Sequence, residues 1–161
     1  MKILIAIIFI INSFTAIGQC NINTTQRPDG NVLKFFNPQP IIREPDHEIG
    51  ISIYENTTTN VLMLNVSVLF KGTSPQKLTN NAILQTSNIK GISLNPLLSE
   101  LIVMNGRDVA IGLYEITEND IKEIGNNNLK SLFISLEGKI TGSTVTENSG
   151  VLKVQLNCLK K

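Results

Sequence analysis

The chain has 161 residues, 42% of them hydrophobic, and its 14 Lys and Arg nearly balance its 13 Asp and Glu. The formal net charge of +1 gives no electrostatic basis for binding nucleic acid or an anionic lipid surface, so we expect no nucleic-acid partner. The length suits one domain that can bury about two-thirds of the surface of its unfolded chain.

The first 18 residues have the order of a secretory signal peptide. Lys2 is a positive start, residues 3–11 are an unbroken apolar run, and Ala16 and Gly18 place small residues before a cleavage site. The apolar run is too short to cross a bilayer, which needs roughly 20 residues. We therefore expect residues 19–161 to form a single exported domain, periplasmic or extracellular, without a transmembrane segment.

Two cysteines, Cys20 and Cys158, lie near the two ends of this mature chain. Gln19 does not suit a lipoprotein signal, which has a small residue directly before the cysteine, so we expect no lipid anchor at Cys20. In an exported chain, two cysteines favour one disulfide. The alternatives are two free thiols or a shared metal ion. A metal site is disfavoured, because the chain has only one His and no further Cys to complete it.

Alternating apolar and polar residues dominate the rest of the chain between closely spaced turn signals, which is typical of an all-β sandwich or barrel. Residues 27–30 form a turn, and 32–37 follow as a strand. Residues 38–48 contain three prolines, which deny hydrogen-bond donors to a central ladder, so we interpret them as a loop or an edge crossing. Strands are expected within 50–56 and over 61–70.

The second half continues this pattern. A strand is expected around 82–87, and residues 91–100 are ambiguous because Pro96 marks a bend. Asn105 and Gly106 predict the two-residue turn of a type I′ hairpin, since both positions need a positive φ.

One helix is expected near 117–125, where Thr117 can cap the first turn and Asp120 stands at the capping-box position. Residues 129–138 and 151–158 are expected to be the last strands. In the final strand, alternation would place on one inward face Leu152, Val154, Leu156 and Cys158. Together these elements predict an antiparallel β-sandwich of about seven to nine strands with one short helix.

The sequence offers no complete catalytic, metal or cofactor motif. His47 is flanked by Asp46 and Glu48, but alternate side chains of an extended segment face opposite ways, so we interpret it as a solvated loop histidine. No G-x-S-x-G elbow, phosphate loop, dinucleotide fingerprint, zinc spacing or calcium loop occurs. The lack of Trp argues against a sugar-stacking site. We therefore expect no catalytic residue, no cofactor and no metal.

Met63 and Leu69 are the candidates for an exposed binding surface. Both lie on the otherwise polar face of residues 61–70, where apolar side chains can mark an interaction site. The alternative is that they pack beneath a neighbouring strand or the helix. The loops at 55–60 and 71–76 and the sheet edges are further candidate surfaces.

The stretch CNINTTQRPDG after the signal, together with the terminal LNCLKK, resembles a loose group of small exported proteins of Gram-negative bacteria. The stretch YEITENDIKEIGNNNLKSLFIS resembles the capped-helix-then-strand unit of β-rich envelope proteins. The resemblance implies export and a β-sandwich closed by its two cysteines. It implies no activity and no functional residues.

We therefore expect a non-catalytic binding or envelope-accessory module with a protein or envelope partner. One alternative is a small secreted hydrolase that uses carboxylates, of which the chain offers Glu44, Glu100, Glu115 and Glu118. The other is a proteinaceous inhibitor of an exported enzyme. An enzyme would show a concave pocket with convergent titratable groups, a binding module an open apolar patch or edge, and an inhibitor a protruding loop.

Overall fold

The computed structural model describes residues 20–88 and 91–160, so the predicted signal peptide over 1–18 lies outside the described residues. The described chain is mainly β, with eleven strands in antiparallel sheets and two helices. The predicted fold class, an antiparallel β-sandwich, is therefore confirmed. There are more strands than expected, and a second helix accompanies the predicted one.

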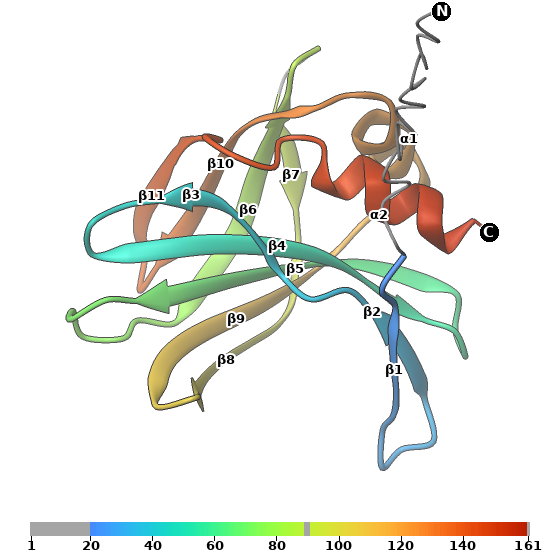
Figure 1. Ribbon diagram of the computed structural model, residues 1–161, viewed down its shortest axis with the longest axis horizontal. Helices are drawn as coiled ribbons and strands as arrows, with labels where there is room; N and C mark the ends of the chain where they lie inside the picture. Colours follow the sequence, from blue (N-terminus) through green and yellow to red (C-terminus); the bar gives the residue numbers. More distant parts are fainter. Residues whose placement is uncertain (1–19, 89–90, 161) are drawn as a thin grey trace, which may run out of the picture.

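The strands form two sheets (Figure 1). The larger sheet contains, in spatial order, β1 (Asn23–Gln26), β2 (Val32–Phe35), β4 (His47–Asn56), β5 (Val61–Phe70), β9 (Arg107–Glu115) and β8 (Pro96–Met104), and β3 (Gln39–Arg43) also pairs with β4. The smaller sheet contains, in order, β11 (Lys139–Thr144), β10 (Leu129–Leu136), β6 (Leu78–Thr86) and β7 (Ile92–Leu94).

The core lies between the sheets and is built by strand alternation, which sends every second side chain inward. In β5 the inward positions follow the pattern expected from the sequence. The fully buried apolar side chains of the two central strands of the larger sheet are Ile49, Ile51, Ile53, Leu64, Val66 and Val68. Their counterparts in the smaller sheet include Leu84, Leu132 and Ile134.

The predicted helix is confirmed as α1 (Glu118–Asn126). The Thr117 side chain accepts a hydrogen bond from the Asp120 N–H, and the Asp120 side chain accepts one from the Thr117 N–H. This reciprocal capping box fixes the start of the helix. Ile124 is the residue of α1 that is fully buried in the core.

The predicted final strand over 151–158 is wrong, because these residues form a second helix, α2 (Val151–Leu159). Leu152 and Leu156 are apolar at both the strand and the helix spacing, so they fit either structure. Val154 separates the two: it is 55% exposed, whereas a strand would have turned it inward. No helix among residues 20–88 and 91–160 is long and apolar enough to span a membrane.

The predicted disulfide is confirmed. Cys20 and Cys158 are bonded, their Cα atoms are 5.6 Å apart, and neither cysteine is free. The bond ties the segment that precedes β1 to the C-terminal part of α2.

β2 and β3 share one edge of β4, with a gap in the pairing between them. β2 ends at Phe35 and β3 begins at Gln39, so the region interpreted as a loop or an edge crossing contains a strand along the edge of β4. Pro38 lies in the gap and has no N–H to donate.

Ile53 of β4 faces this gap. Its C=O accepts a hydrogen bond from the Phe36 N–H at 3.2 Å, and its N–H donates to Oε1 of Gln155 in α2 at 2.7 Å. A side chain of α2 therefore replaces the missing strand partner. Without it, a buried backbone donor would lack an acceptor.

Residues 145–148 join the two sheets at one side. The Val145 N–H donates to the C=O of Lys130 in β10 at 2.8 Å, and the Thr146 N–H donates to the C=O of Ile41 in β3 at 2.9 Å. The Asn148 side chain adds a 2.8 Å hydrogen bond to the C=O of Pro40. This segment covers the outer edge of β3.

We expect the double substitution Cys20→Ser and Cys158→Ser to lower the free energy of unfolding, because the disulfide restricts the unfolded chain over a separation of 138 residues. The chain-entropy account gives about 5 kcal/mol for a loop of this length. Urea denaturation of the oxidised wild-type protein and the double variant, followed by circular dichroism, measures the difference. Unfolding curves that coincide would show that the bond contributes nothing to stability.

Candidate functional site

β8 is the last strand of the larger sheet and forms a hairpin with β9. The turn residues Asn105 and Gly106 have φ values of 51° and 73°, and Met104 pairs with Arg107 across them. The positive φ at both positions confirms the predicted two-residue hairpin turn. The register of β8 against β9 is therefore fixed from the turn outward.

This register decides which backbone groups β8 leaves open. The residues that flank a two-residue turn form a hydrogen-bonded pair, and the N–H and C=O groups of successive residues point to opposite sides. Counted from Met104, the even-numbered residues point their backbone N–H and C=O groups toward β9. The residues that point their backbone groups to the other side are Ser99, Leu101 and Val103. No strand of the described chain pairs with that side of β8.

Most of the exposed large apolar side chains of the described chain lie on this strand. Five of the eight are Leu97, Leu98, Leu101, Val103 and Met104, with exposed fractions of 52%, 43%, 37%, 72% and 51%. Both faces of β8 contribute, because the β8–β9 hairpin extends beyond the smaller sheet (Figure 1). The one charged side chain of β8 is Glu100.

Two other edges of the larger sheet are better protected. β1, at the opposite end of the larger sheet, has four residues, all polar, and β3 is covered by residues 145–148. Edge strands are usually kept from pairing with other chains by short length, charge, Pro or bulges. β8 has nine residues. Its Pro96 and its bulge both lie at its N-terminal end and protect only that part of the edge. The rest of its outer side is open to another extended chain.

The single histidine, His47, is not the solvated loop residue that we expected. It is the first residue of β4, 13% of its side chain is exposed, and its Nδ1 lies 2.7 Å from Oδ1 of Asp46. This hydrogen bond lowers the pKa of the Asp46 carboxyl below its ordinary value. Ser74 lines the same cavity of about 210 Å³, but within the described residues no hydrogen bond joins it to His47.

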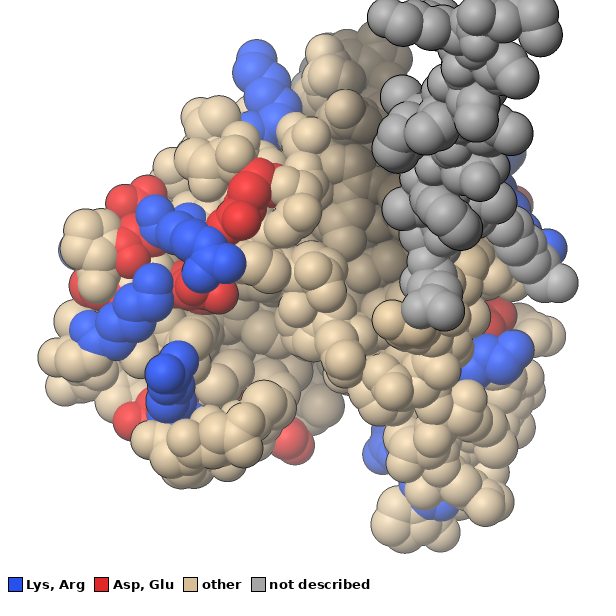
Figure 2. Space-filling view, viewed as in Figure 1, with Lys and Arg blue, Asp and Glu red and all other residues tan. Residues whose placement is uncertain are grey.

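Glu48 turns toward cations rather than toward His47. Arg43 pairs with both Glu48 and Glu147, and Nζ of Lys71 is 3.6 Å from Oε2 of Glu48. Figure 2 shows charged side chains gathered at the end of the molecule where β3, β4 and β5 have their ends. In the part of the chain that the structure describes, no group of three His, Cys, Asp or Glu side chains could hold a metal ion.

The two predicted surface residues have different positions. Leu69 is half-buried and lines an apolar groove of about 240 Å³ with Met104 of β8 and Val109 of β9, so it adjoins the open strand. Met63 is 8% exposed and adds little to the surface.

The exposed apolar residues of β8 were not recognised as a candidate binding surface, because Pro96 made the first half of the strand ambiguous. One signal could have found them. Apolar residues stand at both odd and even positions of LLSELIVM, as in a strand that is buried on both faces or exposed on both.

The carboxylates considered for hydrolysis lie on four different segments. Glu44 follows β3, Glu100 lies on β8, Glu115 ends β9, and Glu118 begins α1. No protein-family model matches the chain, and no curated protein or solved structure is significantly similar to it. Its function has to be inferred from its own geometry and chemistry.

Proline substitutions at neighbouring positions of β8 should have opposite consequences. The Val103 N–H points to the open side, so Val103→Pro removes a donor that the described chain does not use, and the hairpin should still form. The Ile102 N–H points to β9, so Ile102→Pro should cost about 1–3 kcal/mol by leaving a β9 carbonyl without its donor. Urea denaturation compares the two. If Val103→Pro is as destabilising as Ile102→Pro, the assignment of the open side is wrong.

Proposed function

We propose that the chain is an exported, non-catalytic binding module that takes up an extended segment of a partner protein as an additional strand on β8. The observation that carries the proposal is the unpaired side of β8, where free backbone donors and acceptors lie among exposed apolar side chains. Main-chain hydrogen bonds give this kind of contact its affinity, and the alternating side chains give it specificity.

The side chains along β8 define the chemistry of the partner segment. Leu101 and Val103 project on one face, and Leu98 and Met104 on the other, so apolar residues on both faces of the added strand gain contacts. Glu100 favours a Lys or Arg opposite it and disfavours an acidic residue, each by about 0.2–1 kcal/mol. The expected segment is extended, largely apolar and carries a central basic residue.

Export is supported by two features. Residues 1–18 have the charge, apolar run and small residues of a signal peptide, and the disulfide between Cys20 and Cys158 suits an oxidising compartment. The resemblance to small exported proteins of Gram-negative bacteria agrees with a periplasmic or extracellular location.

Substitution of Val103 by Lys tests the binding edge. Immobilised residues 19–161 should retain a partner protein from the culture fluid or envelope fraction of the source organism. Val103→Lys should reduce the retained amount by about tenfold or more, because lysine on an edge strand opposes the addition of another strand. Ile140→Lys is the matched control, since Ile140 is 75% exposed on β11 in the smaller sheet, and it should retain as much partner as the wild type.

Two outcomes would contradict the proposal. Equal retention by the wild type and Val103→Lys would exclude β8 as the binding edge. If the wild type retains only further copies of this chain, and Val103→Lys converts a dimer to a monomer, then β8 pairs with itself rather than with a partner.

The alternative of an inhibitor has one supporting observation. The β1–β2 hairpin projects from the larger sheet (Figure 1), and its tip is closed by a 2.9 Å hydrogen bond from the Gly30 N–H to the Arg27 C=O. The hairpin begins close to Cys20, so the disulfide anchors its base. An inhibitor that acts through this loop would lose its target on Arg27→Ala and keep it on Val103→Lys, the reverse of the proposed pattern.

A further inference from the structure

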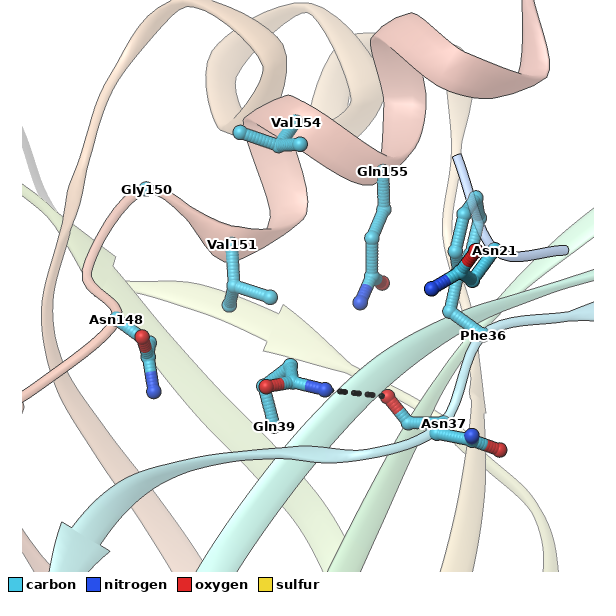
Figure 3. Close-up of a pocket in the computed structure, with 9 residues that line it drawn as sticks. All are labelled: Asn21, Phe36, Asn37, Gln39, Asn148, Gly150, Val151, Val154 and Gln155. Atoms are coloured by element: carbon cyan, nitrogen blue, oxygen red, sulfur yellow. Dashed lines mark hydrogen bonds between the residues drawn. The ribbon is translucent and has the colours of Figure 1, made fainter. Parts of the chain in front are cut away.

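A recess of about 460 Å³ lies where α2 packs over the gap between β2 and β3 (Figure 3). This volume falls within the range of roughly 300–1,000 Å³ that is usual for small-ligand sites. Five of its nine lining residues carry carboxamides, namely Asn21, Asn37, Gln39, Asn148 and Gln155. None of the nine has an ionisable side chain.

Gln155 brings an unused donor to this recess. The residue is 5% exposed, and its Oε1 is occupied by the N–H of Ile53 at 2.7 Å. No described residue accepts a hydrogen bond from its Nε2. Figure 3 shows the carboxamide pointing from α2 into the recess. Nε2 is not among the buried unpaired side-chain atoms of the described chain, so it is reachable from the recess, and a ligand acceptor there could take its hydrogen bond.

The neighbouring carboxamides are also only partly used. Oδ1 of Asn37 accepts from Asn23 at 3.1 Å, which leaves its Nδ2 as a donor. Nδ2 of Asn148 donates to the Pro40 C=O at 2.8 Å, which leaves its Oδ1 as an acceptor. The recess therefore offers both donors and acceptors, and all of them are neutral.

The disulfide holds two walls of the recess together. Asn21 directly follows Cys20, and Gln155 stands about one helical turn before Cys158 in α2. The bond therefore preorganises the site, which lowers the cost of ordering it around a ligand.

We propose that this recess binds a short, uncharged peptide through its main-chain amides. A peptide C=O can accept from Nε2 of Gln155, and a peptide N–H can donate to Oδ1 of Asn148. Small apolar side chains can contact Val151 and Val154 on α2. The site is separate from the strand-addition edge, and the proposal does not depend on that function.

Two other ligand classes fit less well. A charged ligand would lose its hydration without gaining a counter-charge, because no ionisable side chain lines the recess. A sugar usually stacks on an exposed aromatic ring, whereas the one aromatic residue of the lining, Phe36, is only 6% exposed.

Titration of residues 19–161 with N-acetyl-dialanine amide tests the site, with the side-chain NH₂ signals of Gln155 and Asn37 followed by NMR. Both signals should shift and saturate.

Gln155→Glu keeps an oxygen for the Ile53 N–H but removes the Nε2 donor, and Val154→Arg fills the mouth of the recess without changing the Ile53 contact. Each variant should weaken binding about tenfold. Gln155→Glu loses one hydrogen bond to the ligand, and Val154→Arg loses contact area with it. Lys153→Ala, exposed on the same helix, is the matched control and should bind like the wild type.

The same titration can overturn the proposal. An absence of saturable shifts at Gln155 in the wild type would remove the site, and an unchanged affinity in Val154→Arg would place binding elsewhere. Uncapped dialanine, which carries both terminal charges, should bind about tenfold more weakly, and equal affinity would contradict the requirement for a neutral ligand. Shifts caused by glucose and not by the capped peptide would show that the ligand class is wrong.

Discussion

Backbone hydrogen bonding at the edges of the two sheets is the constraint on which the rest of this structure depends. A buried N–H or C=O without a partner is costly, so each interruption of strand pairing needs a substitute. At the gap between β2 and β3, Gln155 of α2 accepts from the Ile53 N–H. Along β3, residues 145–148 supply the missing donors. β8 differs from both, because its outer side has no strand partner in the described chain.

The two candidate binding regions follow from this constraint in different ways. α2 reaches the gap between β2 and β3, so the helix lies over that edge of β4. The recess lined by carboxamides lies between the helix and the sheet. The disulfide between Cys20 and Cys158 keeps the helix in that position. At β8 no helix or loop substitutes for the missing strand, so the same backbone groups that are satisfied elsewhere remain available to another chain.

Local signals in the sequence were enough for much of this fold. Alternation identified β5, the capping box at Thr117 and Asp120 located α1, and Asn105–Gly106 located the β8–β9 hairpin. The disulfide followed from two cysteines in a chain that was expected to be exported. α2 could not be separated from a strand, because Leu152 and Leu156 suit both periods. The role of Gln155 depends on Ile53, 102 residues away, and no local pattern reports such a contact. The outer edge of β8 was not recognised as a binding surface, because its exposure depends on how far the smaller sheet extends.

Amide hydrogen exchange along β8 tests the open edge most directly. In the purified protein, at a concentration where it is monomeric, we predict rapid exchange at Ser99, Leu101 and Val103, whose N–H groups point away from β9. The amides of Glu100 and Ile102, which point toward β9, should be protected by the hairpin ladder. Equal protection at all five positions would contradict the account, because it would mean that the outer side of β8 is already covered.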